Sequence, residues 1–225
     1  YWGGYSQMAR IKSDFLIPMP EGMDTKTAMQ IGTAGYTAML MVMTLEEAGV
    51  TPEKGPVMVT GASGGVGSNA VAILAGLGYE VAALTRSTGG PVHDYLKEIG
   101  AKEIVCGEEW SQKPAPLESQ KWAGAIDNVG SVVLARLLAQ MNYGGCVAAC
   151  GLAAGFDLPT TVMPFILRGV SLRGVDSVSC PVERRTAAWD RLVTDMPGSA
   201  LDTINEIIPL ENVPEYAEKI LAGGI

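Results

Sequence analysis

A glycine-rich turn interrupts an apolar stretch in the first third of the chain. Residues 62–67 read Ala-Ser-Gly-Gly-Val-Gly, the pattern G-x-G-x-x-G with alanine in the first place. A strand is predicted before the turn and a helix after it, so free backbone N–H groups at the helix start can bind an anion. Gly64 would admit a pyrophosphate, Gly67 would allow close packing of helix on strand, and Ser63 adds a hydroxyl donor. We therefore predict a dinucleotide-phosphate site formed by Ala62, Ser63, Gly64, Gly65, Val66 and Gly67. The alternative is a turn of small residues that only joins the two elements.

A single arginine follows the next apolar stretch. About twenty residues after the glycine turn, the predicted second strand ends in Thr85-Arg86-Ser87. In dinucleotide folds this tip faces the adenosine ribose, where an acidic residue would bind the ribose hydroxyls. No acidic residue stands between Leu84 and Gly90, and a guanidinium flanked by hydroxyls fits a 2′-phosphate. The pattern favours NADPH over NADH, held by Thr85, Arg86 and Ser87. The alternative is a solvated surface charge.

Two more strand ends should meet the same crevice, because ligands lie outside the carboxyl ends of parallel strands. They are the segments 127–130, Asp-Asn-Val-Gly, and 150–153, Cys-Gly-Leu-Ala. We expect backbone groups there to hold the ribose and the nicotinamide amide. Asp127 is interpreted as a hydrogen-bonding residue of the loop rather than a catalytic one, and Cys150 as a packed thiol.

Composition narrows the function classes. The chain has 225 residues, of which 48% are hydrophobic, enough for one large domain or one and a half. Its formal net charge of −8 argues against nucleic-acid binding. No uninterrupted run of 18 apolar residues predicts a membrane span. The start, Tyr-Trp-Gly-Gly, is neither a signal peptide nor an initiating methionine. We expect a cytoplasmic protein and a chain that is part of a longer one.

Zinc is disfavoured by the ligands available. The four cysteines form no C-x-x-C pair, and His93 is the only histidine. Cys146 and Cys150 share a predicted strand, where four residues span roughly 13 Å, too far for one zinc. We predict no metal site and expect reduced, packed cysteines.

The elements that position these residues alternate between strand and helix. Strands are predicted at 55–62, 79–86, 102–107, 122–130, 144–151 and 171–177, and helices at 65–77, 92–99 and 131–140. A helical stretch after Asp24 is broken at Gly32 and Gly35, and the tail, 181–222, is mostly helical. Apolar strands between amphipathic helices predict an α/β fold, a doubly wound parallel sheet covered on both faces. Residues 1–21 alternate polar and apolar, which predicts a strand or two ending another domain, or an N-terminal edge strand.

Taken together, the segments resemble a known family. "GTAGYTAM", "VTGASGGVGS", "GAIDNVG", "MNYGGCVAACGLA" and "TTVMPFILRGVSLRGVDSV" occur in this order. They are similar to the zinc-free quinone-oxidoreductase branch of the medium-chain dehydrogenase/reductases, and within it to the bacterial NADPH-dependent acrylyl-CoA reductases. The resemblance covers the whole chain and is most specific over 141–178.

The resemblance implies a Rossmann domain at 22–225, following a GroES-like catalytic domain of which 1–21 would be the end. It implies NADPH-dependent reduction of acryloyl-CoA to propionyl-CoA in a homodimer. Thr33 and Thr37 would lie near the nicotinamide, and Gly151 and Leu152 would contact its carboxamide. Asn128 belongs to the first of the two strand-end segments described above, so we expect it at the ribose on that ground.

Relatives usually carry about ninety more residues before this start and a further strand after this end. No catalytic residue is named, and we expect the 225 residues alone to turn over poorly. The rival interpretations are a quinone or enone reductase acting on small non-CoA substrates, and a non-catalytic NADPH-binding redox sensor.

Overall fold

The computed structural model describes residues 4–222, and their contacts divide the chain into two units. One unit runs from Met19 to Ile204. The other consists of the described residues of the two chain ends, 4–18 and 205–222. All the predicted site residues belong to the larger unit.

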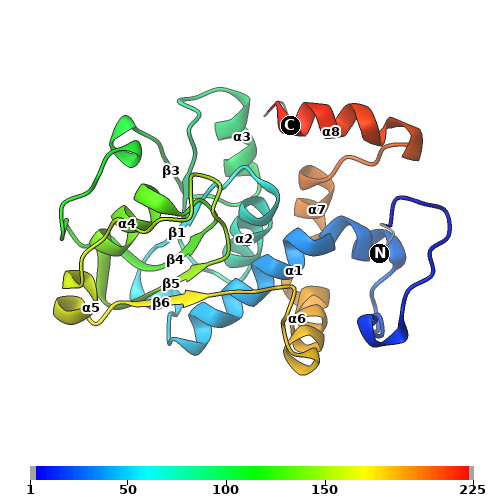
Figure 1. Cartoon of the computed structure of the whole chain (residues 1–225), viewed down its shortest axis with the longest axis horizontal. Coiled ribbons are helices and arrows are strands. Elements are labelled where there is room, and N and C mark those ends of the chain that lie inside the picture. Colours follow the sequence, from blue (N-terminus) through cyan, green and yellow to red (C-terminus); the bar gives the residue numbers. More distant parts are fainter. Residues whose placement is uncertain (1–3, 223–225) are drawn as a thin grey trace. The chain divides into compact units, whose positions relative to one another are not determined.

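The larger unit contains one parallel sheet of six strands (Figure 1). The strands are β1 (Val57–Thr60), β2 (Val81–Leu84), β3 (Glu103–Val105), β4 (Trp122–Asp127), β5 (Met141–Ala149) and β6 (Ser171–Gly174). Their order is β3-β2-β1-β4-β5-β6, and every neighbouring pair is parallel. This is the order of two mononucleotide-binding halves joined at β1 and β4. The predicted doubly wound α/β fold is confirmed.

The helices connect and cover these strands. They are α1 (Thr25–Glu47), α2 (Gly65–Gly76), α3 (Pro91–Glu98), α4 (Ser131–Gln140), α5 (Met163–Arg168), α6 (Val182–Asp195), α7 (Gly198–Ile204) and α8 (Val213–Leu221). Short 3-10 turns lie at Ser13–Phe15, Pro52–Lys54, Glu108–Ser111 and Leu210–Asn212. Asp24 caps the start of α1, because its carboxylate accepts the Thr27 N–H at 2.7 Å.

Both faces of the sheet are buried, as continuous apolar strands require. Val57 and Val59 of β1 belong to the core cluster that includes α1, α2 and α6, whereas Met58 belongs to the cluster that includes α4. The same alternation holds along β2, where Val81 and Ala83 pack on one side. Alternate residues of these strands therefore pack against the helices on opposite faces of the sheet. Because all six strands are parallel, their carboxyl ends lie along one edge of the sheet.

The predicted break in the first helix lies at Gly32 alone. Its backbone has φ 50° and ψ −154°, which favours glycine, and helical segments continue on either side. Gly35 is helical and serves packing instead, since a Cβ there would lie 3.0 Å from Asn69 Oδ1 on α2. By length and composition α1 could span a membrane, but most of its apolar window is buried against the sheet and its neighbouring helices.

The strands predicted within residues 1–21 are wrong for the part described. Residues 4–21 contain the 3-10 turn Ser13–Phe15 and otherwise irregular backbone. A strand needs a neighbouring strand that hydrogen-bonds its N–H and C=O groups. No residue within 4–222 forms a strand pair with residues 4–21. The proposed domain boundary at residue 21 stays a prediction.

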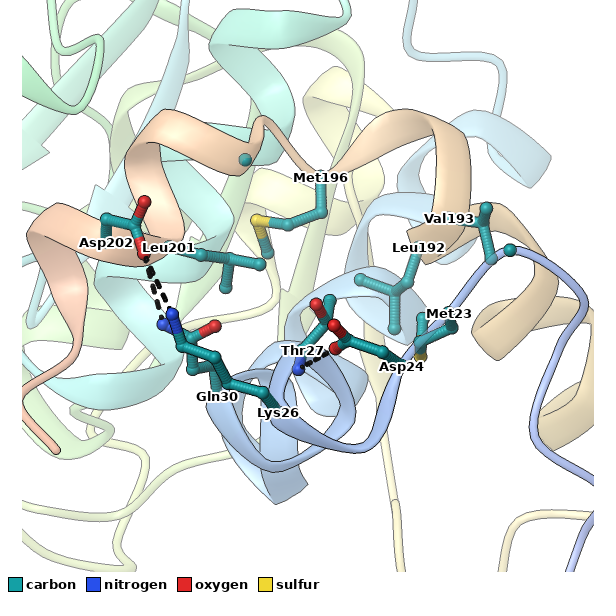
Figure 2. Close-up of a pocket in the computed structure, with 12 residues that line it drawn as sticks. Met23, Asp24, Lys26, Thr27, Gln30, Leu192, Val193, Met196, Leu201 and Asp202 are labelled. Carbon is teal, nitrogen blue, oxygen red and sulfur yellow. Dashed lines mark hydrogen bonds and ion pairs between the residues drawn. The ribbon is translucent and has the colours of Figure 1, made fainter.

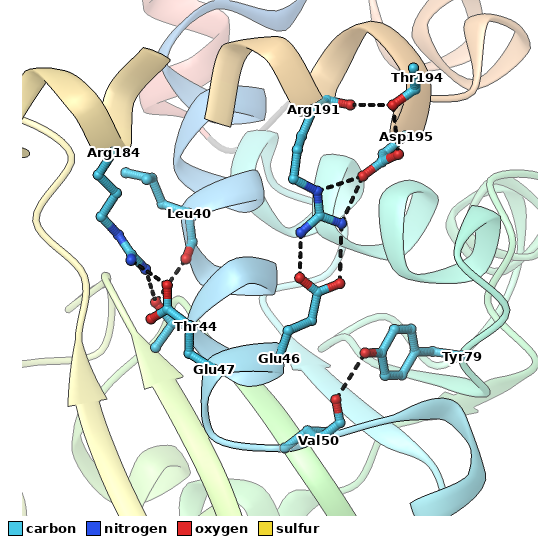
Figure 3. A network of polar contacts seen from close by, with 10 residues as sticks. All are labelled: Leu40, Thr44, Glu46, Glu47, Val50, Tyr79, Arg184, Arg191, Thr194 and Asp195. Carbon is cyan, nitrogen blue, oxygen red and sulfur yellow. Dashed lines mark hydrogen bonds and ion pairs between the residues drawn. The ribbon is translucent and has the colours of Figure 1, made fainter. Parts of the chain in front are cut away.

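Arginines on α6 hold it to α1 (Figure 3). Arg191 contacts both carboxylate oxygens of Glu46 and donates to Asp195 Oδ2 at 2.7 Å. Arg184 pairs with Glu47 and donates to Thr44 Oγ1 at 3.0 Å. These partly buried pairs fix the helix that follows the last strand.

We expect Arg191→Gln to lower the free energy of unfolding by about 2 kcal/mol, because Glu46 and Asp195 lose a shared cation in a partly buried site. Denaturant unfolding followed by circular dichroism measures this. The control is Lys219→Gln, which removes an exposed i,i+4 pair with Glu215 and should change stability by less than about 0.5 kcal/mol. Equal effects of the two variants would contradict the assignment.

Candidate dinucleotide-binding site

The turn at 62–67 joins β1 to α2 and is open to solvent. Ser63, Gly64 and Gly65 are exposed, while Ala62 and Gly67 are buried. A Cβ on Gly67 would lie 2.2 Å from the Gly61 carbonyl oxygen, so only glycine lets α2 start this close to the strand. The Ser68 hydroxyl reinforces the turn by donating to the Ala62 carbonyl at 3.1 Å.

The amide groups of the turn are available. Helical hydrogen bonding begins with Ser68 N–H to the Gly64 carbonyl at 2.8 Å. Within residues 4–222 no acceptor takes the N–H groups of Gly65, Val66 or Gly67. These donors, together with the positive end of the α2 dipole, form a cradle that an anionic group fits.

The kink of α1 lies against this cradle. A Cβ on Gly65 would be 3.3 Å from the Ala34 Cβ, which places the start of the second helical segment beside the turn. Thr33, the neighbouring residue, is exposed. Thr37 is 5% exposed and its hydroxyl donates to the Thr33 carbonyl at 2.7 Å. The structure thus brings Thr33 to the edge of the site, whereas the Thr37 hydroxyl is occupied within the helix.

The tip of β2 lies next to the turn. The Ala62 N–H donates to the Leu84 carbonyl at 3.2 Å. Beyond it, the Thr85 hydroxyl oxygen accepts the Ser87 N–H at 3.1 Å, and the Ser87 hydroxyl donates to the Gly89 carbonyl at 2.8 Å. Both hydroxyls therefore shape the loop.

Arg86 stands out from this loop as an exposed cation. It makes no ion pair or hydrogen bond with any residue in the described part of the chain. His93, which sequence reasoning used only to argue against zinc, supports the loop, because its Nε2 lies 2.8 Å from the Ser87 carbonyl oxygen. No pattern in the sequence points to that contact.

A second polar cluster joins the ends of β1 and β4. The Thr60 hydroxyl donates to Asp127 Oδ1 at 2.7 Å and accepts the Asn128 N–H at 3.0 Å. Asn128 Nδ2 donates to the Thr60 carbonyl at 2.7 Å. Sequence reasoning missed Thr60, although its place at the end of a buried strand beside the glycine turn was a usable signal.

Asp127 is fully buried and acts as the predicted hydrogen-bonding residue of the loop. Besides Thr60, it accepts the Gly130 N–H at 2.9 Å. Burial raises the pKa of this carboxyl, and the Thr60 and backbone hydrogen bonds oppose that rise. The carboxylate ties the end of β1 to the loop after β4 and faces no solvent.

The end of β5 approaches the end of β4 closely. A Cβ on Gly151 would lie 2.1 Å from the Asn128 carbonyl oxygen, so glycine is required there. The Cys150 thiol donates to Asn128 Oδ1 at 3.3 Å, and burial, then the nearby Asp127, raise its pKa to about 11. Leu152 is 64% exposed at the mouth of this junction. The tips of β2, β1, β4 and β5 thus form one polar row.

A separate hollow of about 410 Å³ lies elsewhere (Figure 2). It is bounded by the start of α1 and by α6 and α7, with Lys26 and Gln30 facing Asp202 across it. None of the predicted cofactor residues lines it. The row of strand tips is therefore the better candidate for a dinucleotide.

Comparison with known proteins identifies a matching family and similar proteins. A profile of the family described as zinc-binding dehydrogenase matches residues 65–194. The acrylyl-CoA reductase AcuI of Ruegeria pomeroyi is 53% identical, over all of this chain and 68% of that protein. The crystal structure of Escherichia coli K-12 YhdH with bound NADPH has a TM-score of 0.96 at 57% identity, over all of this chain and 69% of that one.

A third relative differs in its cofactor. The crystal structure of Bacillus subtilis YhfP with NAD bound has a TM-score of 0.90 at 46% identity, over 96% of this chain and 65% of that one. The chain described here spans about two thirds of the length of these relatives.

Proposed function

This chain belongs to the zinc-binding dehydrogenase family, within the medium-chain dehydrogenases and reductases, and from that premise we propose that it binds NADPH for the reduction of acrylyl-CoA. The observation that carries the proposal is the open cradle of free N–H groups at residues 65–67, with Arg86 two residues beyond the Leu84 carbonyl that accepts the Ala62 N–H. Arg86 has no partner in the described part of the chain. The names of the Ruegeria and Escherichia relatives support the choice of substrate and cofactor.

The residues present fit the cofactor in order along the row. The cradle would hold the pyrophosphate, and Arg86 the 2′-phosphate. The clamp of Thr60, Asp127 and Asn128 would fix the loop beside the ribose. Gly151 and Leu152, at the end of β5, would contact the nicotinamide amide beyond it. When bound, NADPH supplies the hydride that reduces the alkene. The chain's own contribution is to hold the dinucleotide extended and correctly placed.

Zinc does not fit the described part of the chain, despite the family's description. Residues 4–222 contain no group of three His, Cys, Asp or Glu side chains placed to bind a metal. His93, the only histidine, is engaged with the Ser87 carbonyl. We derive no step through a metal from these residues.

The decisive experiment follows NADPH oxidation at 340 nm by the protein at its natural full length, with acrylyl-CoA as substrate. We expect turnover that depends on both compounds. Menadione and methyl vinyl ketone, a quinone and a small enone without CoA, are the comparison substrates. Faster turnover of either would favour the small-substrate reductase instead, and tight NADPH binding without oxidation by any of them would favour a sensor.

A homodimer is proposed on the free edge of the sheet. β6 ends the strand order, and within the described chain it pairs only with β5. Such an edge can pair with its twin across a two-fold axis. On α5, which precedes β6, Ile166 is 73% exposed and Leu167 is 55% exposed, which adds apolar surface. Light scattering coupled to size-exclusion chromatography would show twice the chain mass, and a monomer at micromolar concentration would refute the proposal.

A further inference from the structure

The loop that carries Arg86 is held by a side chain from the next helix. This loop, residues 85–89, runs from the end of β2 to Gly90, the N-cap of α3. His93, in the first turn of α3, places its ring Nε2 2.8 Å from the Ser87 carbonyl oxygen. A carbonyl oxygen can only accept a hydrogen bond, so Nε2 carries a proton and donates it. The imidazole therefore ties the residue directly after Arg86 to α3.

The helix that supplies the imidazole is fixed by the core. Leu96 of α3 is fully buried in the core cluster, and Val92 and Tyr95 pack against the same cluster. The His93 N–H also donates to the Gly90 carbonyl at 2.9 Å, which closes the first turn of the helix. His93 thus holds an exposed loop to a helix that cannot easily move.

Hydrogen bonds anchor the chain on both sides of Arg86. After it, the Ser87 N–H donates to the Thr85 hydroxyl at 3.1 Å, and the Ser87 hydroxyl donates to the Gly89 carbonyl at 2.8 Å. Before it, the Thr85 N–H donates to the Val105 carbonyl at the end of β3 at 3.0 Å. Arg86 therefore lies between two fixed residues, while its own side chain is exposed.

The contacts of the loop differ in where the second partner lies. The two bonds of Ser87 with Thr85 and Gly89 close the loop on itself. Within the described chain, two hydrogen bonds join residues 85–89 to other elements, one from Thr85 to the end of β3 and one from His93 to Ser87. Without the imidazole, the residues after Arg86 would keep only contacts inside the loop.

We propose that His93 is a positioning residue that sets the preference for NADPH over NADH, because it holds the loop in which Arg86 meets the 2′-phosphate. This rests on the proposed function, which puts that phosphate at Arg86. The ring itself does not touch the phosphate. It fixes residue 87, and this lowers the cost of ordering the loop when the guanidinium binds. NADH has no phosphate at that position, so its affinity gains nothing from the contact.

Two substitutions separate the donor of His93 from its bulk. His93→Phe keeps a planar ring and removes the donor, whereas His93→Gln keeps an N–H donor at a similar reach. Fluorescence titrations of the full-length protein at pH 8, where a phosphate monoester is a dianion, measure NADPH and NADH affinities. We expect His93→Phe to lower NADPH affinity about three- to tenfold and NADH affinity less than about twofold. His93→Gln should stay within about twofold of the unsubstituted protein for both cofactors.

Lys97 provides the control on the same helix. It is exposed and lies one turn after His93 on α3. Lys97→Gln should leave both affinities within about twofold at physiological salt, because an exposed charge away from the site is screened. If Lys97→Gln lowers NADPH affinity as much as His93→Phe does, the effect belongs to the helix and not to the imidazole, and the assignment is wrong.

A double substitution tests whether His93 acts through Arg86. An Arg86→Ala protein has no guanidinium to position, so adding His93→Phe should lower its NADPH affinity by less than about a further twofold. A general structural role would give the same loss in both backgrounds. Additive losses would therefore overturn the proposal even where the single variant behaves as expected.

Hydrogen exchange reports on the loop without any cofactor. The Ser87 N–H should exchange about three- to tenfold faster in His93→Phe than in the unsubstituted protein, and at the unsubstituted rate in His93→Gln. Equal exchange in all three proteins would show that the imidazole does not hold the loop. An unsubstituted protein that binds NADPH no better than NADH would refute the proposed NADPH site and this inference with it. A His93→Phe variant that keeps a clear NADPH preference of the unsubstituted protein would refute this inference alone.

Discussion

Replacing Gly67 by alanine should produce the largest loss of stability among single substitutions at the proposed cofactor site. The added Cβ would lie 2.2 Å from the Gly61 carbonyl oxygen and 2.7 Å from the Ala62 Cα, and both of these are backbone atoms that cannot turn aside. The helix must move away from β1. We expect about 3 kcal/mol of destabilisation and a melting temperature lower by roughly 10 °C.

The same substitution should weaken NADPH binding, because the free N–H groups of the first turn shift with the helix. Calorimetry and fluorescence titration measure the two effects. Gly174→Ala is the matched control, since its Cβ would meet no atom within 4 Å and its backbone φ is ordinary. If both glycine variants melt at the same temperature, the close approach of α2 to β1 does not hold in solution.

Arg86→Ala should change which dinucleotide is preferred rather than whether one binds. A charge-assisted contact with a 2′-phosphate contributes about 1.5–3 kcal/mol, so NADPH affinity should fall by roughly 10- to 150-fold. NADH affinity should change less than about twofold, because NADH has no phosphate at that position. Separate fluorescence titrations of the two cofactors give both numbers.

The control for this experiment removes a positive charge elsewhere. Lys102 is exposed and precedes β3, and its N–H donates to the carbonyl of Val81 at the amino end of β2. It therefore lies at the end of the sheet opposite the site. Lys102→Ala should leave both affinities unchanged at physiological salt. If the Arg86→Ala protein still prefers NADPH, another residue must bind the 2′-phosphate. NADH is included in the titrations because the YhfP structure contains NAD.

Local features of the site could be predicted well. The positions of Gly64 and Gly67 in the sequence indicate the turn between β1 and α2. The helix predicted over 131–140 has the same bounds in the structure. Arg86 was placed at a strand tip because β2 is a short apolar run that ends where hydroxyl residues begin. In each case the determining forces act over a few residues, through backbone conformation, helix capping and the burial of an apolar strand.

Residues 4–21 show where such local patterns fail. Their alternation predicts a strand, but pairing depends on a partner distant in sequence, and none of the described residues supplies one. Thr37 is a milder case. Its position in the helix was predictable, but only the fold shows that its hydroxyl is already used by the Thr33 carbonyl.

The sequence by itself determined the doubly wound sheet, the glycine turn at 62–67 and the charge at the tip of β2, because strand burial and glycine geometry are encoded in neighbouring residues. Only the tertiary structure decided how those pieces meet. The Thr60–Asp127 clamp, the contact of Ala34 with the glycine turn and the stacking of Tyr36 on Trp189 each join segments far apart in the chain. Such contacts depend on how strands order and helices pack in space, which local spacing does not specify.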